Sequence, residues 1–478
     1  MSIQETAILE PGLAWILIAL FTLLYVGLGW YFGRHDKELD QFVLAGRRVG
    51  LAVGTATAMA TWVTSNTTMM APQLAYQMGI WGMIGYSLGA VGLLLFAPLA
   101  KRIRHLMPYG YTSGDFVRLR YGNLAWRIFL AISLFYSLGW LVSLGMAGGV
   151  LTHALSGIPY WQGMTVILAA CVSYTLIGGF RAVIGTDFIQ SILILVGLVV
   201  LAWLTIGSIG FDEIHTSLER ERPELLSLMM PAAIMFLFNN LLFGMGEIFH
   251  SNVWWTRAYS FREGVGQWAY LLAGIFWAPI PIVAGFIALA SPALGTNIPA
   301  ADMVGPIVAS ELLGLTGAVI VLVMVFAALA SSLDSLLAAT AMLVVRDLYY
   351  RHFKPHASGE HLRTATKVTI LLLGILAWLL CLPKITTLAQ LLHFTGAFVA
   401  STIWPIAAGL YWRRTNQWGA SLAMVLGSAA GILAYFQIGF YVGALVGAAV
   451  SMVVVLATTW ARPGDFDWER LREPPPNH

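Results

Sequence analysis

The stretch Ala60-Thr61-Trp62-Val63-Thr64-Ser65-Asn66-Thr67-Thr68-Met69-Met70-Ala71-Pro72 decides how this sequence is interpreted. It lies inside an apolar run, yet hydroxyl and amide side chains fill most of its middle. Such side chains compete for backbone hydrogen bonds, and Pro72 has no backbone N–H to donate. Since a membrane helix must satisfy its polar backbone groups without water, we expect the helix over 50–76 to break in mid-membrane. The freed carbonyl and N–H groups would then need a polar partner.

The composition around this stretch is that of a membrane protein. Of 478 residues, 59% are hydrophobic and only 10% are charged, and the mean hydropathy is +0.78. Soluble domains average about 25% charged residues. A soluble enzyme, a disordered protein and a nucleic-acid-binding protein are therefore excluded, and a net charge of +3 describes no polyanion-binding surface. Cys171 and Cys381 both lie in apolar runs, so no disulfide framework is indicated.

Apolar runs long enough to span a bilayer follow one another along almost the whole chain. A spanning helix needs about 20 apolar residues, because the hydrocarbon core is about 30 Å thick. We expect an all-α polytopic protein with about 13 transmembrane helices in one membrane domain, residues 1–462, because no connection is long enough for a second domain. The expected spans are 12–33, 50–76, 80–100, 126–151, 160–179, 183–208, 228–249, 267–290, 312–345, 366–384, 387–412, 417–437 and 439–461.

The distribution of basic residues predicts the orientation. With the N-terminus outside, all but three of the 26 Lys and Arg residues fall in cytoplasmic connections, and the exceptions are Arg220, Arg222 and Lys384. Basic residues are retained on the cytoplasmic side during insertion. We therefore expect an inner (plasma) membrane protein with its N-terminus outside and a cytoplasmic tail, 463–478.

A second stretch, Asn239-Asn240-Leu241-Leu242-Phe243-Gly244-Met245-Gly246-Glu247, combines paired amides, two glycines and a carboxylate. Here we also expect a break, in the seventh helix. Because the second and seventh helices cross in opposite directions, helices 2–6 (about 48–209) and 7–11 (about 228–414) are predicted to be inverted repeats. Broken helices in matching places of two repeats indicate a transporter's central site. The alternative is that small and polar residues simply mark close helix contacts.

The ninth helix carries Ser331 and Ser332 in an apolar setting, with the carbonyl of Ala328 one turn earlier on the same side. Sodium prefers oxygen ligands, and neutral oxygens allow its release. Freed carbonyls of Ala60 and Val63 would complete a sodium site. The alternative is that the serines bond back to their own helix. Asp334 is expected either on the ion path or in a structural salt bridge with Arg346.

At this point the chain resembles the sodium:solute symporter family, whose fold is the LeuT-like five-plus-five inverted repeat. The stretches that carry the resemblance run in order from 42 to 420, and they are Phe42–Arg48, Tyr174–Val183 with Thr186, Asp187 and Gln190, Ser331–Ser335 with Val345–Tyr349, and Leu410–Arg414 with Asn416–Ala420. The resemblance implies a cation held by carbonyls of two residues three apart in helix 2 and by a carbonyl and two adjacent hydroxyls of helix 9. In this sequence those positions are the five already named.

The resemblance also implies further site residues. Asp187 matches an acidic residue on the cytoplasmic route of the released ion, although Asp187 with Gln190 also has the pattern of a helix N-terminal cap. The solute is implied between the broken parts of helices 2 and 7, with helices 3 and 11 contributing. The matching positions are Trp62, Thr64, Asn66, Thr67, Tyr86, Asn240, Gly244, Glu247 and His393.

The stretches 60–72, 111–122 and 254–257 are similar to the urea-permease branch of this family. Glu247 has no counterpart that maps there. It is expected to bind an amine, to gate the pathway, or to pair with His250 three residues later.

We therefore expect a secondary active symporter that couples sodium influx to the uptake of a small polar organic solute, namely a urea-like amide, an amino acid or a short carboxylate. Sodium is co-transported, the other partners are the solute and the lipid bilayer, and the protein is a monomer or a weak homo-oligomer. A proton-coupled symporter using Asp187, Glu247 or His393 and a solute-binding membrane sensor are the alternatives. An enzyme is not expected, because ten histidines are scattered and no HExxH or CxxC motif is present.

Overall fold

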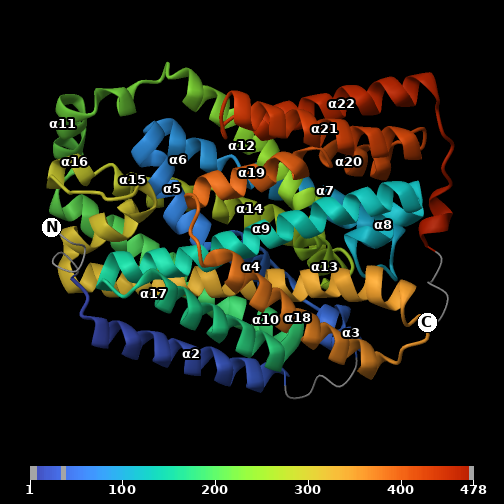
Figure 1. Ribbon diagram of the computed structural model, residues 1–478, viewed down its shortest axis with the longest axis horizontal. Helices are drawn as coiled ribbons and strands as arrows, with labels where there is room; N and C mark the ends of the chain where they lie inside the picture. Colours follow the sequence, from blue (N-terminus) through green and yellow to red (C-terminus); the bar gives the residue numbers. More distant parts are fainter. Residues whose placement is uncertain (1–7, 34–38, 473–478) are drawn as a thin grey trace.

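Helices make up nearly all the regular structure in residues 8–33 and 39–472, the part of the chain that the computed structural model describes. Strand-like pairing among these residues is limited to an isolated bridge between Val49 and Phe261. Most helices lie along one axis, which is horizontal in Figure 1. The ends of the predicted domain and tail, residues 1–7 and 473–478, and the connection 34–38 lie outside the described residues. The all-α prediction is confirmed.

The longer helices that follow the chain from its N-terminal side are α2 (Pro11–Gly33), α3 (Leu39–Leu44), α4 (Leu51–Trp62), α5 (Ser65–Met78), α6 (Ile80–Ser87), α7 (Ala90–Leu106), α8 (Ser113–Tyr121), α9 (Asn123–Ser156), α10 (Tyr160–Ser208) and α11 (Phe211–Glu221). They are followed by α12 (Pro231–His250), α13 (Asn252–Ser260), α14 (Val265–Trp277), α15 (Pro279–Ala288), α16 (Ser291–Leu294), α17 (Val304–Leu343), α18 (Gly359–Cys381), α19 (Leu388–Ala400), α20 (Ile403–Tyr411), α21 (Gln417–Gln437) and α22 (Gly443–Ala461).

Eleven helical segments of the described part are long and apolar enough to cross a membrane. One of them, α10, has 49 residues and would be roughly 74 Å long if straight, far more than a bilayer core. Gly179 divides it, because its φ of 59° and ψ of −165° are not helical. The pair α4 and α5 forms one more crossing from two short pieces. With α10 counted as two spans and α4–α5 as one, the described helices match the thirteen expected spans in position.

The break in the second helix is confirmed. α4 ends at Trp62, Val63 (ψ 80°) is no longer helical, and Thr64 (ψ 169°) is extended before α5 begins at Ser65. The Thr64 hydroxyl accepts the N–H of Thr67, and the Thr67 hydroxyl accepts the N–H of Thr64. This capping box stabilises the start of α5 in the interior, as expected where hydroxyl side chains gather.

The break in the seventh helix lies later than predicted. α12 is helical through the whole of 239–247 and ends at His250, and the interruption is at Ser251 (ψ 128°), before α13. The polar residues of 239–247 instead serve tertiary contacts. Asn239 accepts the N–H groups of Ala444 and Leu445 at the start of α22, and Gly244 lets α12 approach Gly89 closely. The close-packing alternative therefore describes this stretch correctly.

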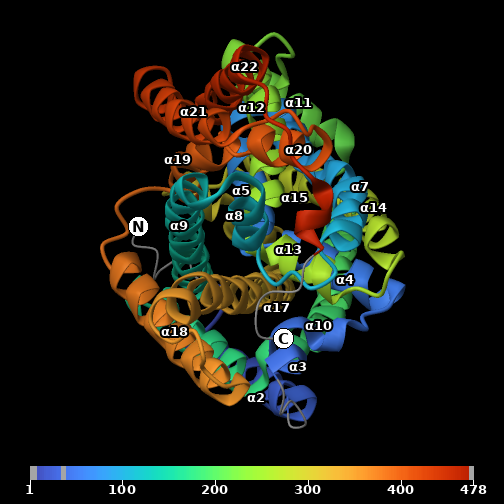
Figure 2. The same ribbon diagram turned by 90° about the vertical axis from the view of Figure 1, so that its right-hand side faces the viewer.

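The helices outside the two predicted repeats lie at opposite edges. α2 packs against α10 along one edge, and α21 and α22 pack together at the other, as Figures 1 and 2 both show. The broken helices α4–α5 and α12–α13 lie between these edges with α9 and α17. The polar residues of both broken helices are thus enclosed by protein.

Candidate functional site

The break between α4 and α5 presents free backbone oxygens inside the protein. The carbonyl of Trp62 accepts bonds from the Thr67 hydroxyl (3.0 Å) and from the Trp277 indole (2.7 Å). No hydrogen bond to the carbonyls of Ala60 or Val63 is found among the described residues, because the N–H groups of Thr64 and Thr67 are used by the capping box. Both residues are fully buried. Two acceptor oxygens are therefore available at this point.

The serine pair of α17 meets this break. The Ser332 hydroxyl lies 3.0 Å from the carbonyl of Ala328 and 3.1 Å from the carbonyl of Thr61, so α17 contacts the last turn of α4. The Ser331 hydroxyl donates to Asp187 of α10 and keeps lone pairs for another partner. The structure thus brings Ser332 to the last turn of α4, with the Ala328 carbonyl beside it. The Ser331 hydroxyl is hydrogen-bonded to Asp187 of α10.

Arg257 of α13 is a site residue that sequence reasoning missed, since its charge was attributed to a cytoplasmic connection. Its side chain is fully buried and lies 3.1 Å from the Asp187 carboxylate. It also donates to Thr57 and Thr61 of α4 and to Ser335 of α17. A buried charge needs such partners, so the pair joins α4, α10, α13 and α17 beside the serine pair. A lone arginine among the tryptophans of 252–260 was the available signal.

Asp187 is not a helix cap, because α10 is helical on both sides of it. Its carboxylate accepts from Thr57 (2.5 Å) and Ser331 in addition to Arg257. Asp334 is also fully buried, with one oxygen bonded to Ser335 at 3.2 Å. The predicted Arg346–Asp334 salt bridge is wrong, since the Arg346 guanidinium stacks 4.1 Å above the Tyr111 ring.

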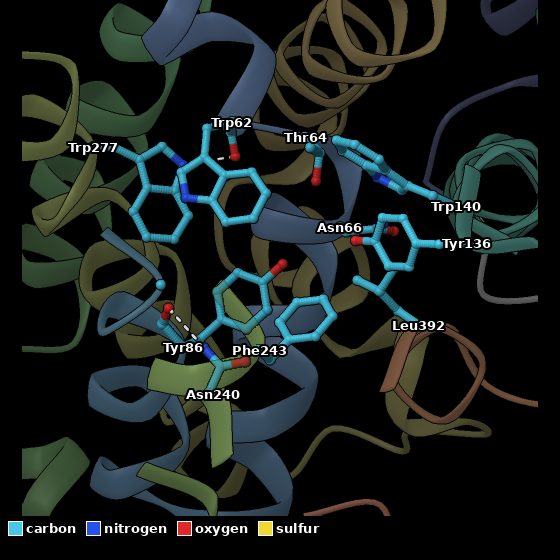
Figure 3. A pocket seen from close by; sticks show the side chains of 11 residues that line it. Trp62, Thr64, Asn66, Tyr86, Tyr136, Trp140, Asn240, Phe243, Trp277 and Leu392 are labelled. Atoms are coloured by element: carbon cyan, nitrogen blue, oxygen red, sulfur yellow. Dashed lines mark hydrogen bonds between the residues drawn. The ribbon is translucent and has the colours of Figure 1, made fainter. Parts of the chain in front are cut away.

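A small pocket lies beside the break (Figure 3). Its wall is mainly aromatic, and none of the residues that line it is an acid, a lysine, an arginine or a histidine. The lining residues are Trp62, Thr64, Asn66, Tyr86, Gly89, Tyr136, Trp140, Asn240, Phe243, Trp277 and Leu392. We call this the aromatic pocket.

Two hydrogen-bond donors of the aromatic pocket have no partner among the described residues. They are the indole N–H of Trp62 and the amide nitrogen of Asn66, and both are buried. The Ser143 hydroxyl donates to the Asn66 oxygen at 3.0 Å and so orients the amide with its nitrogen free. By contrast, the Asn240 amide nitrogen is used by the carbonyls of Gly85 and Tyr86. The aromatic pocket therefore offers unpaired donors and an apolar wall.

Five of the nine predicted solute residues line the aromatic pocket, namely Trp62, Thr64, Asn66, Tyr86 and Asn240. The other four serve other contacts. Thr67 caps α5, and Gly244 packs on Gly89. His393 stacks on Phe243 with its Nδ1 at the carbonyl of Ala389. Glu247 binds the Trp254 indole through both oxygens, at 3.0 and 3.1 Å, and does not pair with His250.

Sequence reasoning also missed six lining residues. Tyr136 and Trp140 come from α9 and Trp277 from α14, helices that were not expected to contribute. The others are Gly89, Phe243 and Leu392. Tyr136 and Trp140 are four residues apart and so share a helix face, but this pattern is equally typical of ordinary packing. Their role became visible only from their position around the break.

The donor set of the site suits a hard cation and a neutral solute rather than a resident transition metal. Within residues 8–33 and 39–472, no group of three or more His, Cys, Asp or Glu side chains is placed to hold a metal ion. Carbonyl and hydroxyl oxygens at the break are the ligand type that sodium prefers.

The family model described as the sodium:solute symporter family matches residues 42–427. Among characterised proteins, a urea–proton symporter of rice (Oryza sativa) is 26% identical over 88% of this chain, and the match spans 64% of the rice protein. An osmoregulated proline transporter of Bacillus subtilis is 28% identical over 87% of this chain and 88% of its own length.

Solved structures share the fold. A Na⁺-coupled sialic acid symporter in a substrate-bound, outward-open state superimposes with a TM-score of 0.77 at 18% identity, covering 95% of this chain and 99% of that chain. Mhp1, a nucleobase-cation-symport-1 family transporter, superimposes in a closed conformation with a TM-score of 0.54 at 16% identity, covering 90% and 96%. These similarities concern the arrangement of helices.

Proposed function

Because the chain belongs to the sodium:solute symporter family, we propose that it couples sodium entry to the uptake of a small, neutral, planar amide such as urea, by alternating access. The observation that carries the proposal is the aromatic pocket: an uncharged cavity with two unpaired donors, beside free carbonyls at a helix break.

The charge of the aromatic pocket argues for the class of solute. A carboxylate or a zwitterion would enter a low-dielectric cavity without a cation in its wall, and burying a charge without a partner is expensive. A neutral amide avoids this cost. Its carbonyl oxygen can accept from Trp62 and Asn66, and its flat faces can pack on the aromatic rings. Amino acids and short carboxylates, the other solutes that the sequence allowed, fit less well.

Sodium is the proposed coupling ion. The carbonyls of Ala60, Val63 and Ala328 and the hydroxyls of Ser331 and Ser332 form the proposed ligand set, and every member is neutral. A neutral set binds a monovalent ion weakly enough to release it. Asp187, held by Arg257, lies next to Ser331 and is proposed to take part in release toward the cytoplasm. Asp334, three residues along α17, is proposed to contribute to the same path.

The remaining proposals concern topology. We place the N-terminus outside and the tail after residue 462 in the cytoplasm, in the plasma membrane, because of the distribution of basic residues. The repeats are proposed to be 48–209 and 228–414, with α2, α21 and α22 added to them.

Uptake into proteoliposomes tests the proposal. With an inward sodium gradient, labelled urea should accumulate above its external concentration, and replacing sodium by potassium should abolish accumulation. Proline and acetate should not compete. Counterflow of urea distinguishes a transporter from a sensor, since a sensor binds without exchange. Sodium-independent equilibration of urea, or competition by acetate as strong as by unlabelled urea, would overturn the proposal.

A variant pair ties this activity to the aromatic pocket. Trp62→Phe keeps an aromatic ring but removes the unpaired indole N–H, so we expect the urea concentration for half-maximal uptake to rise about tenfold, the effect of roughly 1.4 kcal/mol. Trp203→Phe is the matched control, because Trp203 of α10 is 78% exposed and does not line the aromatic pocket. Equal behaviour of the two variants would argue against solute binding at Trp62.

A further inference from the structure

Glu247 is a buried carboxyl group without a cation. Its side chain is fully buried, and the indole N–H of Trp254 is shared between its two oxygens at 3.0 and 3.1 Å. No lysine, arginine or histidine forms an ion pair with it among the described residues. The buried acids Asp187 and Asp302 differ in this respect, since Arg257 and Lys384 are their partners. An indole N–H binds a carboxylate but cancels no charge.

The groups around Glu247 do not supply the missing charge. On its own helix, His250 has its Nδ1 2.9 Å from the carbonyl of Gly246, and its Nε2 has no partner among the described residues. Its ring meets the Tyr136 ring edge-on at 5.0 Å. From the neighbouring helices α9 and α6, the titratable groups that interact with the carboxyl are the phenols of Tyr136 and Tyr86. Phenols and a neutral imidazole carry no charge, so an ionised Glu247 would be an isolated charge among them.

Glu247 adjoins the aromatic pocket. Asn240 and Phe243 line that pocket, and Glu247 follows them by seven and four residues on the same face of α12. Its partner Trp254 meets the Trp62 ring edge-on at 5.5 Å, and Trp62 is also part of the wall. Tyr86 and Tyr136 line the same wall. Trp254 and Trp62 therefore lie between the Glu247 carboxyl and the aromatic pocket.

We propose that Glu247 binds a proton that travels with the solute, so that each cycle moves one proton inward in addition to sodium. An isolated buried charge disfavours the closed conformation, and a neutral acid does not. The carboxylate takes a proton from the external solution when the outer side is open, holds it while both sides are closed, and gives it to the cytoplasm when the inner side opens. One positive charge crosses with each proton, and no other reactant is consumed.

This inference is separate from the proposed sodium site, which involves α4, α5 and α17 and shares no residue with it. A variant can lose sodium coupling and keep proton coupling, or the reverse. Proton coupling therefore has its own measurable consequence: at equal sodium on both sides, an external solution one pH unit more acidic should raise urea accumulation about tenfold.

The test uses the full-length protein in proteoliposomes that contain a trapped pH-sensitive dye, with sodium equal on both sides and the voltage clamped by potassium and valinomycin. Adding urea should acidify the lumen in step with labelled urea uptake. Glu247→Gln should lose this acidification, and its remaining uptake should become independent of external pH. Asp302→Asn is the matched control, because it removes another buried acid, one that pairs with Lys384 and belongs to neither proposed site, so acidification should persist.

Either of two results would overturn the inference. If urea enters without acidifying the lumen, or if Glu247→Gln acidifies it equally, Glu247 carries no proton. If Asp302→Asn loses acidification as Glu247→Gln does, the loss is not specific to Glu247, and the proton site is refuted. Should the glutamine variant fail to fold, the infrared carbonyl-stretch band of a carboxylic acid still gives a readout, since Glu247→Asp should shift it. Acidification without sodium dependence would overturn the sodium proposal and leave this one standing, and the absence of both effects would overturn both.

Discussion

At the scale of single residues, Arg257 determines the charge balance beside the serine pair. It is fully buried and is the cation that pairs with Asp187 among the described residues. Its other bonds reach Thr57, Thr61 and Ser335, which belong to two different helices. Removing one member of a buried pair leaves the other as an uncompensated charge, and this cost exceeds the net value of the pair itself.

Arg257→Gln should therefore lower the free energy of unfolding by about 3–5 kcal/mol, because Asp187 would be left buried without its cation. The double variant Arg257→Gln with Asp187→Asn should recover part of that loss. Thermal unfolding in detergent measures both. Arg120→Gln is the control, since the buried Arg120 guanidinium bonds carbonyl groups and the Thr415 hydroxyl and pairs with no acid in residues 8–33 and 39–472. A double variant no more stable than the single one would show that the two residues act independently.

Ser332→Ala removes a hydroxyl that lies between the carbonyls of Ala328 and Thr61. If that hydroxyl is a sodium ligand, the sodium concentration for half-maximal uptake should rise about tenfold or more, since each 1.4 kcal/mol of lost affinity is a factor of ten. Protein abundance should fall much less. Ser451→Ala is the control, because the buried Ser451 hydroxyl also bonds a carbonyl, that of Ser401, but belongs to α22. Unchanged sodium dependence would exclude Ser332 from the site.

At the scale of elements, the two broken helices show what sequence can and cannot predict. The break after Trp62 was predictable, because hydroxyl side chains offer a local substitute for backbone bonds and Thr64 and Thr67 provide it here. The break at Ser251 was not, since Asn239, Asn240 and the glycines suggested an earlier position. An amide that breaks a helix and an amide that binds a neighbouring helix are identical in sequence. Only the partner, such as the start of α22, distinguishes them.

Gly244→Ala tests the close approach of α12 to the loop before α7. A Cβ atom at Gly244 would lie 2.7 Å from the Cα of Gly89. This is a backbone atom, so no side-chain rotation can relieve the overlap. We expect a loss of about 1–3 kcal/mol of stability, the usual cost of overpacking. Gly27→Ala in α2 is the control, because nothing lies within 4 Å of its added Cβ. Thermal unfolding in detergent compares them, and equal melting temperatures would show that the helices separate without cost.

At the scale of the whole molecule, the count of crossings and the composition of each span were predictable because hydropathy is a local property. The site was only partly predictable. The helix 2 residues and the serine pair follow from polar side chains in an apolar setting. Tyr136, Trp140, Trp277 and Arg257 do not, because an aromatic residue in a membrane helix is common and its direction depends on how distant helices pack.

The predicted orientation can be tested with the two ends of α18. Ile385 and Phe353 are 81% and 71% exposed, and α18 crosses between them. A cysteine at position 385 should react with a membrane-impermeant thiol reagent in intact cells. A cysteine at position 353 should react only after the membrane is permeabilised. The natural Cys171 and Cys381 are fully buried and give little background. The opposite labelling pattern would reverse the topology.

Adjacent asparagines give α12 two different attachments. Asn240 faces the aromatic pocket, and Asn239 accepts the first N–H groups of α22, at 2.9 and 3.2 Å, with its side-chain oxygen. These bonds attach α22 to α12, which contributes to the wall of the aromatic pocket, although α22 belongs to neither proposed repeat. A tilt of α12 must pull on α22, whose outer side bears residues such as Val453, 60% exposed. A fluorescent probe fixed there would register solute docking from the outer rim of the protein, without touching the cavity.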